Sequence, residues 1–211
     1  MELIKTLLGW LRDPGLAIAW AGYPGMALII FMETGALVAF LPGDSLLVVA
    51  GTYAAKGDLN LLYLNALLIP MAILGDAVSY FIGAKSGQAL FNRPQSRLFK
   101  PANLKAAHAF YEKHGGKAII VARFMPIVRT FVPVVAGIAG MPYRRFAAYN
   151  VIGGASWVAS MTLIGYFIGQ VVPDIGKHIE KVIIVVVLVS ILPGVWAWFK
   201  NRNAPKPQAA A

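Results

Sequence analysis

Long apolar stretches alternate with short polar ones along the chain, and this pattern predicts a polytopic membrane protein. A membrane-spanning helix needs about 20 predominantly apolar residues. Five stretches have lengths near or above this value and carry at most two charged residues each; they cover residues 16–55, 59–84, 118–143, 146–172 and 182–199. Segments of this kind are typical of transmembrane helices, so the predicted fold class is all-α.

Two of these stretches contain residues that break helices. The first break falls within residues 34–55, at Gly35, Pro42 and Gly43. The second falls within residues 118–143, at Pro126, Pro133, Gly137, Gly140 and Pro142. A proline removes a backbone hydrogen bond from a helix, and irregular backbone at membrane depth is tolerated only where protein or a water-filled cavity covers it. We therefore interpret both stretches as re-entrant helical hairpins, over about residues 33–55 and 118–143.

Basic residues set the expected orientation. Residues 85–117 form a polar segment with seven lysines and arginines and one acid, Glu112, and basic loops face the cytoplasm. With residues 118–143 as a hairpin, twelve basic residues of the loops and the tail lie inside and two lie outside; with the same residues as a full span, nine lie inside and five outside. The hairpin fits the charge rule better, and six full spans remain the alternative.

The resulting layout has about four full transmembrane helices and two opposed re-entrant hairpins in corresponding places, as in an inverted-repeat transporter. Residues 16–200 then form a single membrane domain with a basic, amphipathic cytoplasmic loop at residues 85–117. Residues 1–15 place leucines and Trp10 on one helical face and are predicted to be an interfacial amphipathic helix. Residues 201–211 are predicted to be a disordered tail, and both termini are expected in the cytoplasm.

Composition agrees with this class and narrows the chemistry. Hydrophobic residues make up 58% of the 211-residue chain and charged residues 13%, which is about half the charged share of a soluble domain. Because the chain has no cysteine and three histidines, it is not expected to hold a metal or another cofactor. The net charge of +10 fits contact with anionic lipid rather than with nucleic acid.

Four charged residues lie within the predicted hairpins: Glu33 and Asp44 in the first, and Arg123 and Arg129 in the second. A charged residue that faces lipid at the bilayer centre costs about 2.5–3.5 kcal/mol, so such residues normally face a cavity and pair with one another. The acids and the arginines are therefore expected to neutralise each other across an interface. Purely structural ion pairs are the alternative, although buried ion pairs often contribute little to stability.

The local sequence around the arginines favours an anion site. Thr130 is expected to cap a half-helix that runs to Gly140, and a helix N-terminus buried in the membrane offers free N–H donors and partial positive charge. With Arg123 and Arg129 beside it, that helix end suits phosphate, which matches the arginine fork. We therefore predict Arg123, Arg129 and Thr130 as substrate-binding residues.

Three acids are predicted to couple transport to protons: Glu33, Asp44 and Asp76. Asp44 or Ser45 is expected at the N-cap of the helix that follows, so a capping role and a functional role are equally open for Asp44. Asp76 lies in the span at residues 59–84, where it pairs with an arginine, relays protons or packs beside polar neighbours.

A further set of residues is interpreted as a small-residue face for helix packing: Asn150, Gly153, Gly154 and Ser156.

These motifs together resemble a known family. The strings that carry the resemblance are FMETGALVAFLPGDSLL from Phe31, GDAVSYFIGAKSG from Gly75, FYEKHGGKAIIVARFMPIVRTFVPVVAGIAGM from Phe110 and RRFAAYNVIGGASWV from Arg144. In this order they closely resemble the DedA family of bacterial inner-membrane proteins, within the VTT-domain or SNARE-associated superfamily, and in particular the DedA subgroup. Any single string is weak, whereas the combination is specific.

The resemblance implies a transporter-like fold with two opposed re-entrant hairpins, in the bacterial inner membrane. It implies lipid translocation, with undecaprenyl phosphate recycling or phospholipid flipping as the leading roles, and a link to the proton-motive force and to envelope integrity. The functional charged residues of the family map onto Glu33, Asp44, Arg123 and Arg129. The identity of the substrate comes from the family alone.

We therefore expect a lipid transporter whose partners are membrane lipids and protons. Two alternatives stay open: a proton- or sodium-coupled exporter of small solutes, and a structural or assembly factor for other envelope proteins. An enzyme such as a lipid phosphatase is not expected, because the chain has no metal motif and no phosphatase-type Ser-Gly-His run. The transport direction, the coupling ion and homo-oligomerisation are left open.

Overall fold

The computed structural model of the chain describes residues 14–35, 43–91 and 116–171. Helices and short turns make up these residues, and none of the described residues forms a strand. The described helices are α2 (Pro14–Gly35), α3 (Gly43–Lys56), α4 (Leu61–Phe91), α6 (Lys117–Ala122), α7 (Pro126–Ile138) and α8 (Tyr143–Val171). The predicted all-α class is confirmed.

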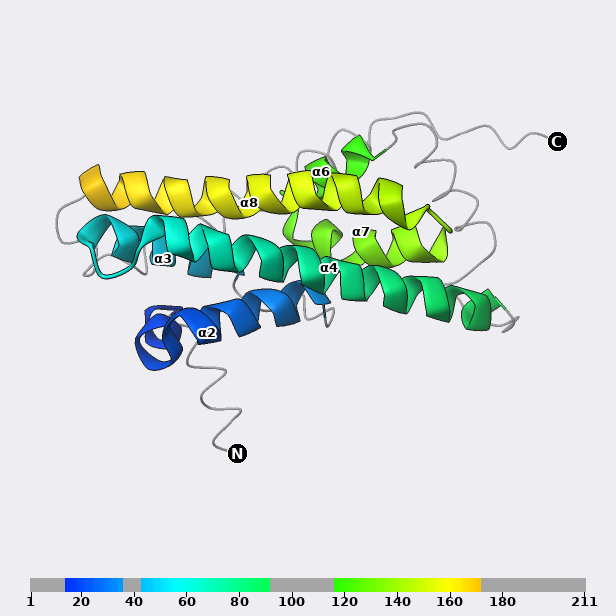
Figure 1. The fold of residues 1–211 in the computed structure, drawn as a ribbon, viewed down its shortest axis with the longest axis horizontal. Helices are drawn as coiled ribbons and strands as arrows, with labels where there is room; N and C mark the ends of the chain where they lie inside the picture. The colour runs from blue at the N-terminus through cyan, green and yellow to red at the C-terminus, as the bar shows by residue number, and fades with distance from the viewer. Residues whose placement is uncertain (1–13, 36–42, 92–115, 172–211) are drawn as a thin grey trace, which may run out of the picture.

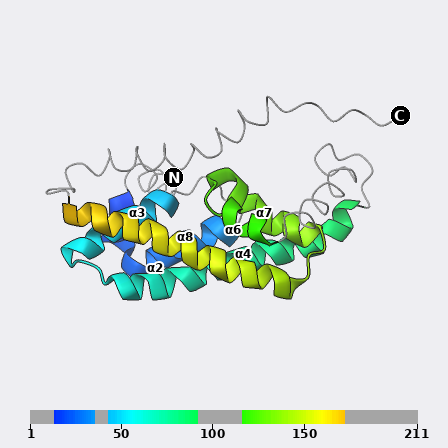
Figure 2. The same ribbon diagram turned by 90° about the horizontal axis from the view of Figure 1, so that it is seen from above.

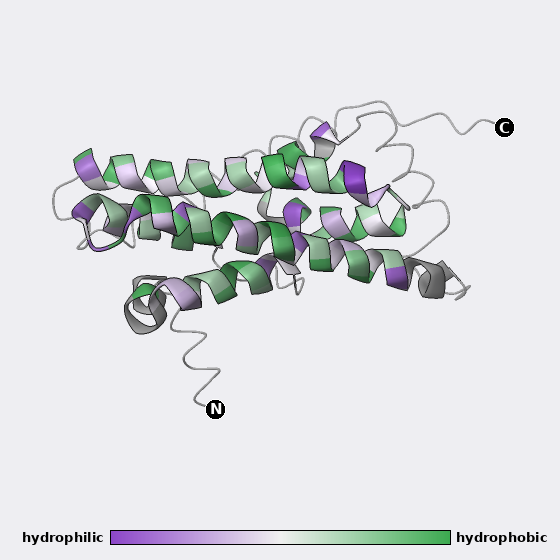
Figure 3. Cartoon of the chain, viewed as in Figure 1, coloured by the Kyte–Doolittle hydropathy of each residue, from purple (hydrophilic) through white to green (hydrophobic). Residues whose placement is uncertain are grey.

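Among the described residues, two helices are long and apolar enough to cross a membrane. They contain the stretches Leu61–Ser86 of α4 and Tyr143–Val171 of α8. Figure 3 shows hydrophobic residues along most of both helices, and large apolar side chains are exposed on them, among them Leu62, Leu74, Phe81, Ile152 and Phe167. Extended exposed apolar surface marks contact with a membrane or a partner.

The two long helices, α4 and α8, organise the other four. Helices α2 and α3 lie toward the end of the structure where α4 begins, and α6 and α7 lie toward the end where α8 begins (Figures 1 and 2). Helix α3 packs along α8 and α7 packs along α4, while α2 packs on α4 and α6 on α8. The two halves of the described chain therefore repeat one arrangement, in which the short helix of each half packs against the long helix of the other.

Glycines allow the same close approach in both halves. Gly51 and Gly165 lie where α3 crosses α8, and Gly83 and Gly137 lie where α4 crosses α7. A Cβ atom at any of the four positions would overlap a backbone carbonyl oxygen of the facing helix. Small residues at such positions let two helix backbones come into contact, which is a common mode of helix packing in membranes.

Buried apolar side chains form two groups, one on each side of the middle of the long helices. The first contains Met26, Ile30, Leu46, Leu64 and Trp157 among others, and the second contains Tyr80, Ile119, Ala136, Met141 and Phe146. The buried polar residues Asp76 on α4 and Asn150 on α8 lie in sequence between the two groups. A polar layer therefore crosses the core at the middle of the bundle.

Helix α2 covers the part of the apolar stretch 16–55 that precedes the predicted hairpin, and it is not one continuous helix. Gly22 interrupts it with φ 53° and ψ −145°, so two helical pieces meet there at a kink. A positive φ is strained for residues with a side chain and is readily adopted by glycine. The hydroxyl oxygen of Tyr23 accepts a hydrogen bond from the Asn60 N–H at 2.7 Å, which fixes the kink beside the turn between α3 and α4.

Each predicted hairpin segment is divided into two helices. In the second segment, fewer of the predicted helix-breaking residues interrupt the helix than expected. Helix α2 ends at Gly35 and α3 begins at Gly43. Helices α6 and α7 are separated at residues 123–125, and Pro133 continues inside α7. Pro133 has no N–H to donate to the carbonyl of residue 129, yet the helix continues because packing along α4 holds it in place.

The boundaries of the predicted cytoplasmic loop also change. Helix α4 continues to Phe91, beyond residue 84 where the apolar stretch ends, because a helix can extend past the residues that are apolar enough to face lipid. Several predictions lie outside the described residues: the interfacial helix except for its last residues, most of the loop at 85–117, the span at 182–199 and the tail at 201–211.

Candidate functional site

Arg129 joins two acids that come from different helices. Its Nη1 donates a hydrogen bond to Asp44 Oδ1 at 2.5 Å, and its Nη2 donates to Glu33 Oε1. Glu33 lies near the end of α2 and Asp44 lies in the first turn of α3. All three side chains are buried, so one guanidinium group bridges two carboxylates between the ends of two helices.

Trp157 completes this cluster from α8. Its side chain is fully buried, and its indole N–H donates a hydrogen bond to Asp44 Oδ1 at 2.7 Å. The Arg129 Cζ atom lies 4.5 Å from the centroid of the Trp157 ring. A guanidinium group at this distance from an indole face makes a favourable cation–π contact. Trp157 therefore contacts both members of the Arg129–Asp44 pair.

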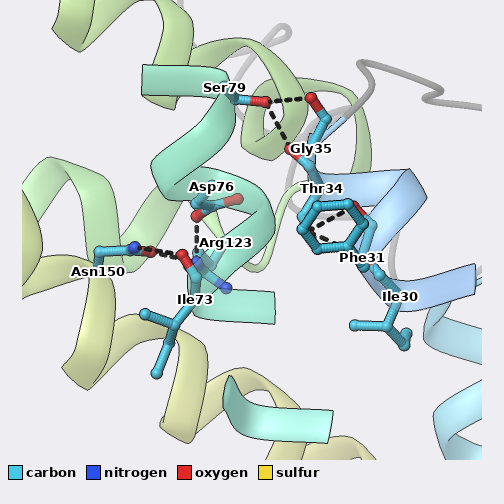
Figure 4. Close-up of polar contacts among 9 residues, drawn as sticks. All are labelled: Ile30, Phe31, Thr34, Gly35, Ile73, Asp76, Ser79, Arg123 and Asn150. Carbon is cyan, nitrogen blue, oxygen red and sulfur yellow. Dashed lines mark hydrogen bonds and ion pairs between the residues drawn. The ribbon is translucent and has the colours of Figure 1, made fainter. Parts of the chain in front are cut away.

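Arg123 forms a second buried cluster with α4 and α8. Its Nη2 donates to Asp76 Oδ2 and to Asn150 Oδ1, and Asn150 Nδ2 donates to the Ile73 carbonyl at 3.0 Å. Figure 4 shows the three polar side chains converging from the turn after α6, from α4 and from α8. Asn150 thus fixes the Arg123–Asp76 pair and connects α8 to the α4 backbone.

The end of α2 is held against α4 close to these clusters. The Ser79 hydroxyl lies 2.7 Å from the Thr34 carbonyl oxygen and 3.1 Å from the Gly35 carbonyl oxygen, and it can donate to either (Figure 4). The last carbonyls of a helix have no partner within the helix. Ser79 supplies one at the position where α2 ends, which keeps Glu33 in place.

The site lies at the middle of the long helices. Trp157 is midway between the ends of α8 at Tyr143 and Val171, and Asp76 is midway along α4. At 1.5 Å per residue, roughly 20 Å of helix lies on either side of Trp157. Charged groups at such depth are costly unless they are paired, which agrees with the burial of every charged group in the two clusters.

Some donors and acceptors in these clusters are not used. The Nε atoms of Arg123 and Arg129 and the Oε2 atom of Glu33 are buried and have no hydrogen-bond partner among the described residues. A guanidinium group has five N–H donors in a planar fork. Each arginine therefore keeps donor capacity for an anion, in addition to the bonds that it makes to carboxylates.

The predicted site residues are distributed over both clusters. Glu33, Asp44 and Arg129 come together as the neutralising set expected across the two hairpins. Arg123 pairs with Asp76 rather than with an acid of the first hairpin. Among the described residues, no group of histidine, cysteine or acidic side chains is arranged to hold a metal ion.

Two predicted helix caps are wrong. Helix α7 begins at Pro126 with Met125 as its N-cap residue and no side-chain cap bond, so Thr130 is buried within the helix rather than at its N-terminus. Proline is favoured at this first helical position, because its missing N–H is not needed there. Helix α3 begins at Gly43, so Asp44 lies in its first turn and neither Asp44 nor Ser45 precedes the helix.

Sequence reasoning missed Asn150 and Trp157 as parts of the site. The predicted small-residue face describes only part of this region of α8. Gly153 and Gly154 leave space for the Arg123 side chain, because a Cβ atom at either would lie 3.1–3.2 Å from Arg123 side-chain atoms. Asn150, by contrast, accepts a hydrogen bond from Arg123. Residues 150 and 157 are two helical turns apart and lie on one face of α8. A polar residue and a tryptophan at that spacing in an apolar span are a signal that was available in the sequence.

Comparisons with known proteins identify relatives over nearly the whole chain. The family model for the VTT domain matches residues 41–167. The chain is 50% identical to Protein DedA of Escherichia coli (strain K12), with 97% of each chain covered. It is 41% identical to an uncharacterized membrane protein of Mycobacterium leprae (strain TN), with 92% of this chain and 87% of the relative covered. It is 34% identical to Inner membrane protein YghB of E. coli (strain K12), with 79% and 76% covered. No solved structure matches the chain significantly.

Proposed function

This chain belongs to the DedA family of VTT-domain membrane proteins, and from that premise we propose that it moves a lipid phosphate across the cytoplasmic membrane without altering it chemically. The lipid is undecaprenyl phosphate or a phospholipid, and the movement is coupled to the proton-motive force. Arg123 and Arg129 bind the phosphate, with Thr130 beside them inside α7. Glu33, Asp44 and Asp76 exchange protons as they lose and regain the arginines.

One observation carries this function: two buried arginines at the middle of the long helices each keep an unpartnered Nε–H. Phosphate accepts paired hydrogen bonds from a guanidinium fork, and such charge-assisted bonds are about twice as strong as neutral ones. Because Glu33 and Asp44 already occupy the Nη atoms of Arg129, an incoming phosphate exchanges with carboxylates rather than entering an uncharged cavity. That exchange avoids leaving an arginine unpaired in the membrane.

The surroundings of the arginines favour an amphiphile over a fully polar solute. Phe124 directly follows Arg123 and is exposed, and Val128 and Phe131 flank Arg129 and Thr130 and are exposed as well. A lipid can place its headgroup among the buried arginines while its tails stay along these exposed apolar side chains in the bilayer. A small polar solute needs an enclosed pathway instead.

The membrane layout in this proposal keeps two opposed re-entrant hairpins. The second piece of α2 and α3 form one, and α6 and α7 form the other, while α4 and α8 cross fully. The repeated packing of short helices on long ones supports this layout, because inverted-repeat transporters place their binding sites where two such halves meet. Both termini are cytoplasmic and the protein lies in the inner membrane.

This layout predicts the accessibility of three positions. Single cysteines introduced at the exposed positions Lys117 and Arg144 are expected to react with a membrane-impermeant maleimide from the cytoplasmic face, and one at Gly57 from the opposite face, because basic residues stay inside. The native chain has no cysteine, so no background has to be removed. Labelling of position 144 from outside intact cells would show that residues 118–143 cross the membrane, and the hairpin arrangement would be wrong.

A reconstitution experiment tests the function itself. Purified protein in liposomes is expected to expose undecaprenyl phosphate or a labelled phospholipid to a reagent on the opposite leaflet, faster with a proton gradient than without one. Empty liposomes and liposomes with an unrelated polytopic protein are the controls. Proton-driven release of an enclosed small solute, with no lipid movement, would favour the exporter alternative. No transport of either class would favour an assembly factor.

A further inference from the structure

Glu33 and Asp44 share Arg129 but have different surroundings. Asp44 Oδ1 accepts hydrogen bonds from both Arg129 and Trp157, and Asp44 lies in the first turn of α3, where the helix dipole favours a negative charge. Glu33 Oε1 accepts a hydrogen bond from Arg129, and its buried Oε2 has no hydrogen-bond partner among the described residues. When Arg129 moves away, Asp44 keeps the Trp157 donor, whereas Glu33 loses the donor that Arg129 supplied to its Oε1.

Gly43 shapes the position of the Glu33 carboxyl group. A Cβ atom at Gly43 would overlap Glu33 Oε2, so the carboxyl group lies directly against the start of α3. Only glycine leaves that space, because any side chain at position 43 would have to displace the carboxyl group. The unpartnered oxygen is therefore enclosed by protein.

The charged groups around Glu33 do not balance. Asp44 faces it from α3 and Arg129 from α7, while Asp76 on α4 and Arg123 after α6 form the adjacent pair. Helix α8 contributes only the uncharged Trp157 and Asn150. Among the residues that the structure describes, three carboxyl groups thus face two guanidinium groups, which leaves one negative charge in excess. An excess charge at this depth is costly, and one bound proton removes it.

We propose that Glu33 is the carboxyl group that takes up this proton, and that Trp157 is a positioning residue that holds the Asp44 carboxyl group in place beside Arg129. This inference rests on the proposed function, because it divides between two residues the proton coupling assigned to both. In the step, hydronium transfers a proton to the Glu33 carboxylate, which gives a carboxylic acid and water. The proton returns to water when Arg129 pairs with Glu33 again.

The division of roles links protonation to lipid binding. An incoming phosphate brings negative charge and withdraws Arg129 from Glu33, so it favours the protonated carboxyl group. By thermodynamic linkage, protonation of Glu33 favours phosphate binding to the same extent. Asp44, held by Trp157, remains the fixed anion to which Arg129 returns after the lipid leaves.

Infrared spectroscopy of protein in an uncharged maltoside detergent tests the assignment without any lipid phosphate. As the pH is lowered, the wild type is expected to gain the carbonyl band of one protonated carboxyl group, whose frequency shifts in Glu33→Asp and stays unchanged in Asp44→Glu, two variants that keep the number of charged groups. The reverse pattern, or no such band in the folded wild type, would overturn the proposal. Because no transport is measured, this result is independent of the proposed function.

Trp157→Phe tests the positioning role, because phenylalanine keeps a ring below Arg129 and loses the N–H donor. In this variant part of the band is expected to move to a second frequency while the total intensity stays that of one protonated carboxyl group, and this second component is expected to shift again in Trp157→Phe/Asp44→Glu. Tyr80→Phe is the matched control: it also removes one buried aromatic donor, which bonds the Met141 carbonyl outside the site, and it should retain the wild-type spectrum. An unchanged spectrum in folded Trp157→Phe would show that Trp157 does not position Asp44.

Proton uptake on addition of undecaprenyl phosphate connects the inference to transport. In a weakly buffered solution with a pH indicator, at the pH where the wild-type carbonyl band is half developed, the wild type is expected to take up protons as it binds the lipid, whereas Glu33→Gln binds it without uptake. Equal uptake in both proteins would overturn the role of Glu33. If neither protein binds the lipid, the proposed function fails, and the infrared result still decides which acid holds the proton.

Discussion

Arg129→Gln is expected to lose transport by about a hundredfold or more, since two hydrogen bonds to a charged group contribute about 1.5–3 kcal/mol each. Arg129 bonds Glu33 and Asp44, and in the proposed function it exchanges between this pair and the lipid phosphate. Arg129→Lys should recover only a small part of the activity, because an ammonium group cannot make the paired bonds of a guanidinium fork. The reconstituted lipid-accessibility assay measures both variants.

The single substitution alone does not separate binding from stability, because it leaves Glu33 and Asp44 as buried, uncompensated charges. The triple variant Glu33→Gln/Asp44→Asn/Arg129→Gln removes the whole charged set. It is expected to accumulate and to elute as the wild type does in size-exclusion chromatography, yet to remain inactive and to bind no lipid phosphate. Arg145→Gln, on the exposed start of α8, is the control and should remain active. Transport at the wild-type rate by the triple variant would assign Arg129 to structure alone.

The identity of the charged residues in this site was readable from the sequence, whereas most of their partners were not. A single charged residue within an apolar stretch can be identified without knowing the fold, and the sequence indicates Glu33, Asp44 and Arg129 in this way. Trp157 and Asp44 are 113 residues apart in the chain. Their contact depends on how closely α3 and α8 pack, which no local pattern specifies.

Helix boundaries were predicted less well than breaks, for a physical reason. The breaks after Gly35 and before Pro126 follow from residues that cannot continue a regular helix in apolar surroundings. The continuation of α4 to Phe91 and of α7 through Pro133 depends on packing and on water beyond the bilayer, which hydropathy does not encode. The error at Thr130 has the same origin, since the N-terminus of α7 was placed one turn too late.

Arg123 is expected to contribute more to stability than any exposed charge does. In Arg123→Gln, Asp76 would remain buried without its compensating charge, and breaking a buried pair from one side costs about 3–5 kcal/mol. Asn150 offers no replacement, because its side chain is uncharged and cannot compensate the carboxylate. Unfolding of the detergent-solubilised protein, followed by tryptophan fluorescence against denaturant concentration, measures the free-energy difference.

The paired variant Arg123→Gln/Asp76→Asn is expected to recover most of that stability, because it removes both charges together and leaves no uncompensated carboxylate. Arg144→Gln, an exposed change on α8, is the control and should shift the free energy of unfolding by no more than about 0.5 kcal/mol. If Arg123 binds the phosphate, the paired variant will be stable and still inactive in the lipid-accessibility assay. If Arg123 serves only to neutralise Asp76, transport will return with stability, and the phosphate site must then be formed by Arg129 without it.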